Sequence, residues 1–349
     1  MTGILPIKKY GEHSALNMFE EYSMLNMYPF SEYTGFTDEE VEDLCLKHNI
    51  DINEMETWYN GYILDNVHIY NPRAVVSAIT RKNFRNYWTS TETYEALKVY
   101  IDYNIDGLKG TIVDLLAGES ILIDTSSFAN DMKTFTGKDD VLTLLVHLGY
   151  LGYIEISETE GQIFIPNEEI KIEFKTAIKT STYWGEIATA LQNSDNLLKA
   201  TIAGKTEDVA SYIKNVHSEV TSILKYNNEN SLSCVISIAY YTATKYYTLI
   251  RELPTGKGFA DIVFIPRKGV DKPAIIVELK YNQTTETAIE QIIKNNYVQS
   301  LQEYKGNILL VAINYDKTTK KHECTIEYDS DSEQQTQPEP TDKISALGW

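Results

Sequence analysis

Two apolar runs with the composition of β-strands stand close together in the last third of the chain. They are GFADIVFIP (258–266) and PAIIVELKY (273–281), and the short polar segment RKGVDK joins them. Apolar runs of this length, separated by turn residues, predict a β-hairpin. If the hairpin is symmetric about its turn, Ile265 pairs with Ala274.

The same register gathers three charged residues at the open end of the hairpin. It places Asp261 opposite Glu278, and Lys280 follows Glu278 by two positions. Because side chains alternate along a strand, all three would share one face. Two carboxylates and an ammonium are suited to bind a divalent cation and to polarise a water molecule. Mg²⁺ takes oxygen ligands, usually one or two carboxylates with waters and substrate phosphate.

Helical patterns occupy most of the preceding chain. Thr37 and Glu40 form a capping box before an acidic helix within 37–57. Apolar residues at helical spacing continue over 92–117 and 184–225.

One segment, 139–174, combines both patterns. Its sequence predicts a helix, a strand, a Glu-Gly turn and a second strand, with Ile154 and Ile156 alternating on one strand and Ile163 and Ile165 on the other. A helix followed by two strands resembles a winged-helix module. The predicted wing, with ETEG and NEEIKIE, is acidic, which favours protein contact or nucleotide-state sensing over DNA binding.

Asp, a hydrophobic hairpin and Glu-x-Lys together resemble the PD-(D/E)xK nuclease superfamily, which has the restriction-endonuclease-like fold. Residues around the hairpin are similar to one bacterial subfamily, in which the nuclease domain follows an AAA-ATPase-like domain; they are Glu252, Gly256-Lys257-Gly258, Ala288, Gln291, Lys294 and Tyr297. The resemblance implies that Asp261 and Glu278 are metal ligands for Mg²⁺ or Mn²⁺ and that Lys280 is the catalytic lysine. It also implies that Gln291 faces the site and that Glu229, on the first core helix, assists. Phe259 departs from the pattern, because the subfamily often has arginine there, so a phosphate contact would be missing.

Each of these residues also has a simpler interpretation. Glu-x-Lys at the end of an apolar strand is commonly a solvated strand end. Gln291 and Tyr297 also fit a helix surface and an apolar core, and Glu229 lies in an Asn-rich stretch that fits an N-cap loop. Members of the superfamily can also keep the fold and lose the activity, so a catalytically inactive binding or regulatory module is the alternative function.

Near the N-terminus, residues 2–24, WYNGY (58–62), YNP (70–72) and NYW (86–88) resemble the late part of the AAA-ATPase-like domain. The chain contains no G-x-x-x-x-G-K-S/T loop, whose backbone amides cradle nucleotide phosphates. We therefore expect no autonomous ATPase activity. The chain is expected to begin after that loop, as a natural truncation, a split gene product or a fragment, and to work with an ATPase-like segment found elsewhere.

The expected fold class is α/β: a C-terminal restriction-endonuclease-like mixed sheet flanked by helices, preceded by a mainly helical region with a winged-helix-like module. The predicted divisions are 1–90 (ATPase-like remnant), 91–182 (winged-helix-like), 183–225 (helical connector), 226–328 (nuclease-like) and 329–349 (disordered acidic tail).

Composition adds three constraints on the partners and surroundings of the protein. The sequence shows neither an apolar stretch of membrane-spanning length nor a signal peptide. The three cysteines form no C-x-x-C pair. Together these features predict a cytoplasmic protein. The net charge of −19 is uneven: 1–225 carries −16, 226–328 carries +1 and 329–349 carries −4.

The nuclease-like region is thus near neutral. Its cations close to the site in sequence could line a groove for phosphates or simply form a solvated rim; they are Lys245, Arg251, Lys257, Arg267, Lys268 and Lys272. The expected partner is nucleic acid, DNA more than RNA. Paired cuts of a duplex would suit a homo-oligomer.

Overall fold

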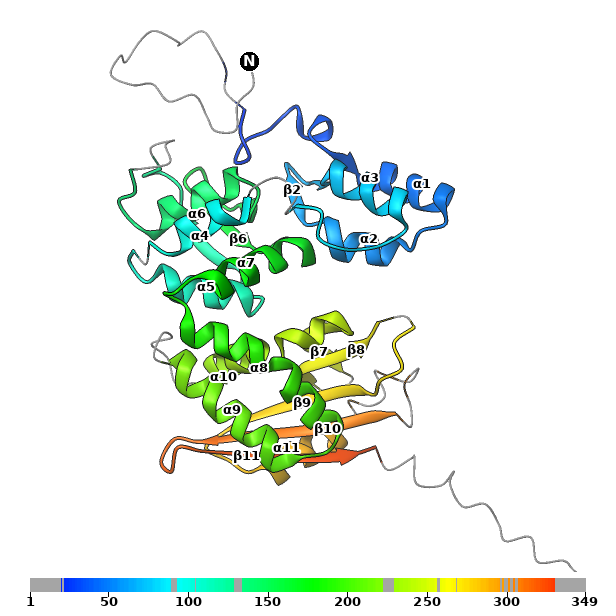
Figure 1. Ribbon diagram of the computed structural model, residues 1–349, viewed down its shortest axis with the longest axis vertical. Coiled ribbons are helices and arrows are strands. Elements are labelled where there is room, and N and C mark those ends of the chain that lie inside the picture. The colour runs from blue at the N-terminus through cyan, green and yellow to red at the C-terminus, as the bar shows by residue number, and fades with distance from the viewer. Residues whose placement is uncertain are drawn as a thin grey trace, which may run out of the picture. The chain divides into compact units, whose positions relative to one another are not determined.

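The computed structural model describes residues 20, 22–88, 93–103, 105–128, 134–221, 229–255, 258–267, 269–295, 297, 301, 304 and 307–329 (Figure 1). The chain divides into two compact units. Unit 1 comprises Met1–Gln192 and Glu219–Lys225, and unit 2 comprises Asn193–Ser218 and Tyr226–Trp349. The finer division predicted from the sequence, and the disorder predicted for the tail beyond Asp329, stay predictions.

Among the described residues, seven α-helices and two small sheets lie wholly in unit 1, which also holds a 3-10 turn at Ser31–Tyr33 and the start of α8 (Gly185–Ile202). The helices are α1 (Asp38–His48), α2 (Ile52–Tyr59), α3 (Pro72–Arg81), α4 (Thr93–Ile101), α5 (Leu108–Leu116), α6 (Lys138–His147) and α7 (Glu168–Thr180). One antiparallel sheet has the order β1 (Phe36–Thr37), β3 (Val67–Tyr70), β2 (Tyr62–Leu64). The other has the order β4 (Ile121–Asp124), β6 (Glu160–Phe164), β5 (Gly152–Glu155).

Several local predictions for unit 1 are confirmed. Thr37 and Glu40 form the predicted capping box at the start of α1. The pattern over 92–117 forms α4 and α5, and Gly107, with a φ of 77°, separates them. The predicted hairpin forms from β5 and β6. No helix among the described residues has the length and apolar character needed to span a bilayer.

The prediction that residues 167–174 continue the second strand of the wing is wrong. These residues form the start of α7. Asn167 caps that helix by accepting a hydrogen bond from the Ile170 backbone N–H, and the apolar positions Ile170, Phe174 and Ile178 recur every four residues and are buried. The acidic residues assigned to the wing therefore belong to a helix.

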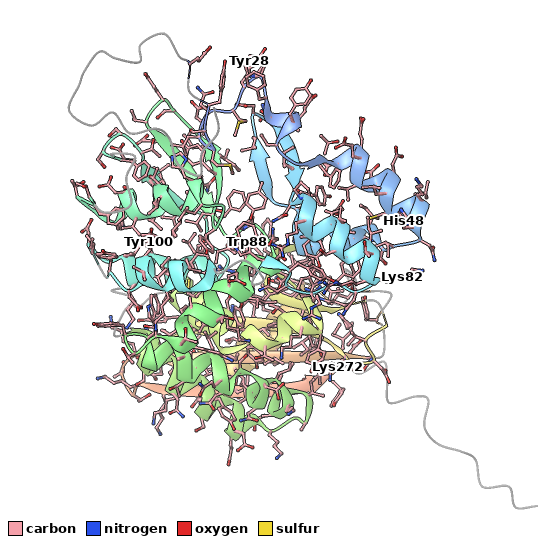
Figure 2. The ribbon with its side chains drawn as sticks, turned by 45° about the horizontal axis from the view of Figure 1, so that its top comes forward. Tyr28, His48, Lys82, Trp88, Tyr100 and Lys272 are labelled. Carbon is pink, nitrogen blue, oxygen red and sulfur yellow. The ribbon has the colours of Figure 1, made fainter. Side chains whose placement is uncertain are left out.

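The WYNGY and NYW motifs hold the interior of unit 1 together. The Tyr59 hydroxyl donates to the carbonyl oxygen of Arg85 (2.9 Å) and accepts from its N–H (3.0 Å). The backbone N–H groups of Tyr87 and Trp88 both donate to Oε1 of Glu169, at 2.6 and 3.0 Å; Figure 2 labels Trp88. These motifs thus make buried and partly buried hydrogen bonds between segments that are distant in sequence.

Unit 1 is expected to lose stability as the pH rises, because two buried carboxyl groups of α7 must ionise. Burial raises the pKa of Glu169 to about 7 and also raises the pKa of Glu173. A carboxyl group with a raised folded-state pKa stabilises the fold at acidic pH, and this stability disappears as the pH passes from about 4.5 to about 7. We expect a fall of about 2 kcal/mol in the unfolding free energy of unit 1 over this range. Urea unfolding should show a smaller pH-dependent fall in unfolding free energy for Glu169→Gln than for the wild type. Glu158→Gln, a substitution in an exposed turn, should show the same fall as the wild type. A pH-independent wild type would contradict this prediction.

Unit 2 is built on a five-stranded mixed sheet with the order β11 (Lys321–Tyr328), β10 (Ile308–Asp316), β9 (Ala274–Tyr281), β8 (Gly258–Pro266), β7 (Tyr247–Thr255). β9 and β10 run parallel and the other neighbours run antiparallel. The helices are the later part of α8 (Gly185–Ile202), most of α9 (Thr206–Thr221), α10 (Glu229–Ala239) and α11 (Thr285–Lys294), with a 3-10 turn at Tyr241–Lys245.

Helices cover both faces of the sheet. α11 packs through Ala288 and Ile292 into a buried cluster with Val263 of β8. The neighbouring Phe264 points to the other face and contacts Tyr240 at the end of α10. Strands buried on both faces read as nearly continuous apolar runs, as β9 and β10 do. The predicted fold class is confirmed, since a mixed sheet flanked by helices is consistent with a restriction-endonuclease-like fold.

The predicted register of the central hairpin is also confirmed. Ile262 pairs with Val277 and Phe264 with Ile275. This is the register that places Asp261 opposite Glu278.

A strained residue interrupts the pairing of β7 with β8. Arg251 pairs with Ile262 and Leu253 with Ala260, while Glu252 between them has a φ of 49°. A side chain makes this left-handed conformation costly by about 1–2 kcal/mol, so Glu252→Gly should raise the unfolding free energy of unit 2 by about 1 kcal/mol. Chemical denaturation would measure the gain. Glu252→Ala keeps a Cβ and should show little of it; equal gains in both variants would contradict the strain.

Candidate functional site

The candidate site lies where β8 and β9 separate. Their ladder includes the pair Ile262–Val277 but does not continue to Asp261 and Glu278. The backbone N–H of Leu279 instead donates to Oδ2 of Asp261 at 2.7 Å. The Asp261 carboxylate thus takes the place of a strand partner, and this contact fixes it beside β9.

β9 places the other two charged residues on one face. Lys280 Nζ donates to Oε1 of Glu278 at 2.9 Å, and the two residues are only 8% and 1% exposed. On the neighbouring β10, Ala312 stands beside Glu278 and Asn314 beside Lys280. Burial of a paired lysine and glutamate is uncommon at a strand end, where both side chains would ordinarily be solvated. The interpretation of Glu-x-Lys as a solvated strand end is therefore wrong.

Helix α11 supplies the fourth predicted residue. Thr284 caps the helix, and Gln291, two turns later, accepts a hydrogen bond from Lys280 Nζ through Oε1 at 2.8 Å. The structure therefore brings Asp261, Glu278, Lys280 and Gln291 together. Glu229 is the first residue of α10, but its side chain lies outside the described residues, so its role stays a prediction.

Glu278 has an unusual electrostatic environment. Burial, with a further contribution from the charge of Asp261, raises its pKa to about 7, and hydrogen bonding from Lys280 and from the backbone N–H of Asp261 opposes this shift. Its Oε2 atom is buried and has no hydrogen-bond partner. A buried oxygen of this kind is costly unless a proton or a cation satisfies it.

These residues suit a hard divalent cation. Asp261 and Glu278 supply carboxylate oxygens, and the unsatisfied Oε2 of Glu278 is a ready ligand. Two carboxylates match Mg²⁺, which completes its coordination with water and substrate oxygens. Within the described part of the chain, no group of three or more His, Cys, Asp or Glu side chains could hold a metal by itself.

Of the described cations predicted near the site, Arg251, Arg267 and Lys272 contact protein groups, and Lys245 is exposed. Arg251 donates to Ser233, and Arg267 donates to the carbonyl of Tyr247. The ammonium of Lys272 lies 4.9 Å from the ring centre of Tyr246. Lys257 and Lys268 lie outside the described residues. Phe259, where the subfamily often has arginine, is 60% exposed.

Sequence reasoning missed one residue that shapes the site. Asn314 is buried on β10; its Nδ2 donates to the carbonyl of Gln283, and its Oδ1 accepts from the N–H of Gln283. It thereby fixes the connection between β9 and α11. A single asparagine inside the apolar run ILLVAINYD was the available signal.

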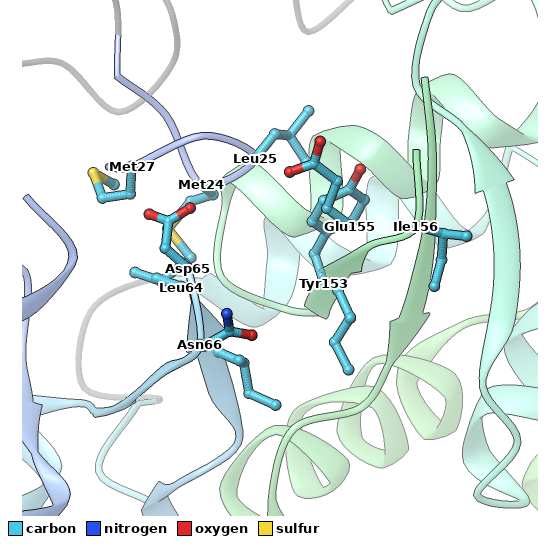
Figure 3. Close-up of a pocket in the computed structure, with 11 residues that line it drawn as sticks. Met24, Leu25, Met27, Leu64, Asp65, Asn66, Tyr153, Glu155 and Ile156 are labelled. Carbon is cyan, nitrogen blue, oxygen red and sulfur yellow. The ribbon is translucent and has the colours of Figure 1, made fainter. Parts of the chain in front are cut away.

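Unit 1 contains a separate pocket of about 370 Å³ between the turn after β2 and strand β5 (Figure 3). Met24, Met27 and Tyr153 contribute to its wall, and its two carboxylates are Asp65 and Glu155. Asp65 already accepts a hydrogen bond from Ser31. None of the predicted site residues lines this pocket.

Comparison with known proteins agrees with the geometry of unit 2. A sequence model of the PD-(D/E)XK nuclease superfamily matches residues 227–325, which contain all five predicted site residues. A protein of Azotobacter chroococcum mcd 1, described as "Uncharacterized protein in vnfD 5'region", is 28% identical over 95 residues. That match covers 27% of this chain and 18% of the relative, so the chain spans less than a fifth of its length. No solved structure matches. The match to the superfamily suggests a nuclease.

Proposed function

We propose that this protein is a metal-dependent nuclease that hydrolyses phosphodiester bonds of nucleic acid, with DNA rather than RNA as the main substrate. One observation carries the proposal. A buried Glu278–Lys280 pair and Asp261 meet where two strands separate, and one buried oxygen of Glu278 lacks a partner. The superfamily match to residues 227–325 supports it.

Each residue then has a distinct role. Asp261 and Glu278 would hold Mg²⁺ or Mn²⁺, which when bound lowers the pKa of water and neutralises charge on the phosphoryl group. Lys280 donates hydrogen bonds to the attacking water or to the phosphate oxygens, where negative charge accumulates. Gln291 holds the Lys280 ammonium from the side of α11. Glu229 is proposed to assist from α10.

The near-neutral charge of residues 226–328 bears on how substrate arrives. Non-specific affinity for nucleic acid comes mainly from cations that neutralise phosphates, and here Arg251, Arg267 and Lys272 contact protein groups, which leaves Lys245 as the exposed cation among the four described. We therefore propose that an ATPase-like segment or a second copy of the chain helps to deliver substrate. The resemblance of the WYNGY, YNP and NYW motifs to an AAA-ATPase-like domain supports the first of these partners.

A catalytically inactive binding module is the second candidate, and the exposed Phe259 in place of an arginine favours it. Metal affinity separates the two candidates. Mn²⁺ binding by the wild type that Asp261→Asn removes would favour the nuclease, whereas no binding by either protein would favour the inactive module.

The direct test is cleavage of plasmid, linear duplex, single-stranded DNA and RNA in the presence of Mg²⁺ or Mn²⁺. The full chain is compared with the Glu278→Ala, Lys280→Ala double variant. Cleavage by the wild type alone supports the proposal and identifies the substrate. Undiminished cleavage by the double variant would show that a contaminant or another site is responsible.

A further inference from the structure

The Lys280 ammonium is the first member of a longer chain of hydrogen bonds. Gln291 Oε1 accepts from Lys280 Nζ at 2.8 Å, and Gln291 Nε2 donates to the Tyr297 hydroxyl at 3.1 Å. Asn295 Nδ2 donates to the same hydroxyl at 3.1 Å. The chain thus runs from the candidate catalytic lysine to a tyrosine beyond the end of α11.

The chemistry of these groups fixes the direction of each bond. An ammonium can only donate, so Gln291 must turn its carbonyl oxygen toward Lys280. Its NH₂ group then points to Tyr297, whose hydroxyl must accept. Turning the amide of Gln291 over would place an NH₂ group against the ammonium, two donors with no acceptor between them. The ammonium of Lys280 therefore sets the orientation of the Gln291 amide, and the Tyr297 hydroxyl, by accepting from the NH₂ group of that amide, holds it in place.

The hydroxyl of Tyr297 is not needed for packing alone. The ring is 1% exposed and lies in the apolar cluster with Ala288, Ile292 and Leu310, where a phenylalanine would pack equally well. A buried hydroxyl costs free energy unless it forms hydrogen bonds, and here two polar side chains supply them.

We propose that Tyr297, held in turn by Asn295, is a positioning residue for Lys280 and acts through Gln291. This inference rests on the proposed nuclease function for its effect on rate. Tyr297 does not contact substrate; it keeps the lysine ammonium where water and phosphate meet it. Loss of the hydroxyl leaves the fold intact but allows the Gln291 amide and the lysine to take other positions.

The test is the variant Tyr297→Phe in the full chain, with Tyr304→Phe as the matched control. Tyr304 packs against the same cluster and donates its hydroxyl to the carbonyl of Pro266. We expect Tyr297→Phe to lower kcat about tenfold with little change in KM, as for loss of one oriented hydrogen bond, and Tyr304→Phe to leave both unchanged. In a Gln291→Ala background, Tyr297→Phe should cause no further loss of kcat, because the hydrogen bonds that link Tyr297 to Lys280 through Gln291 are already absent. An unchanged kcat, or additive losses in the double variant, would overturn the proposal.

A second measurement does not depend on activity. Amide hydrogen exchange over residues 274–294 would be followed in Tyr297→Phe, Lys280→Met and the double variant. Tyr297 and Lys280 both form hydrogen bonds with Gln291. Non-additive changes in protection from exchange therefore support the positioning role of Tyr297, and additive changes overturn it. If the wild type cleaves no substrate but the changes in exchange protection are non-additive, the proposed nuclease function is contradicted while the positioning of Lys280 by Tyr297 is supported.

Discussion

Lys280→Met should lower the cleavage rate constant by about 10²–10⁴-fold while the protein still folds. Methionine keeps the unbranched apolar stem that β9 buries and removes only the ammonium. The variant loses both hydrogen bonds of that ammonium, to Glu278 and to Gln291, and with them the donor for water or phosphate. Single-turnover assays at saturating substrate and Mg²⁺ would measure the loss.

Folding must be separated from chemistry in this experiment. Removal of Lys280 leaves Glu278 buried beside an apolar side chain, so the pKa of Glu278 should rise further above about 7 and the carboxyl should take up a proton. This proton limits the destabilisation that an unpaired buried charge would otherwise cause. Lys317→Met, at an exposed position in the turn between β10 and β11, is the matched control and should cleave like the wild type. Full activity of Lys280→Met would contradict the assigned role of the lysine.

Glu278→Gln is expected to abolish cleavage and to weaken Mn²⁺ binding by about 100-fold or more, because one of the two carboxylate ligands is lost. Isothermal titration calorimetry of Mn²⁺ would measure the affinity. Glu290→Gln, an exposed substitution on α11, should bind Mn²⁺ as the wild type does. Retained affinity in Glu278→Gln would exclude this residue as a ligand.

The same variant should be more stable than the wild type without metal at pH 8. Burial raises the pKa of Glu278, so ionising this carboxyl opposes folding, and the stability it provides at acidic pH is lost as the pH rises from about 4.5 to about 7. A neutral glutamine avoids this cost, and we expect a gain of about 2 kcal/mol in the unfolding free energy at pH 8. Opposite changes in stability and cleavage would show that the site sacrifices stability for metal binding. A loss of stability in Glu278→Gln would show instead that its charge supports the fold.

The two strands that carry the site could be predicted from local patterns. The apolar runs 258–266 and 273–281 needed only strand alternation and a turn between them, and the structure confirms their register. The capping box at Thr37 was equally local, because its donor and acceptor lie three residues apart. The prediction that the second wing strand continues over 167–174 was wrong for a related reason. IKIEF alternates as a strand would, but Asn167 caps a helix at its N-terminus, and Ile170, Phe174 and Ile178 recur at helical spacing.

What the sequence by itself determined is the hairpin, its register and the grouping of Asp261, Glu278 and Lys280, since these follow from pairing rules between neighbouring segments. Only the tertiary structure decided that Glu278 and Lys280 are buried and that the Glu278 pKa is raised. It also decided that Tyr297 bonds to Gln291 and that His217 of α9 lies 2.6 Å from His322 of β11, ring nitrogen to ring nitrogen. Burial and hydrogen-bond partners depend on how helices cover the sheet, and that packing brings together residues whose separation along the chain carries no local signal.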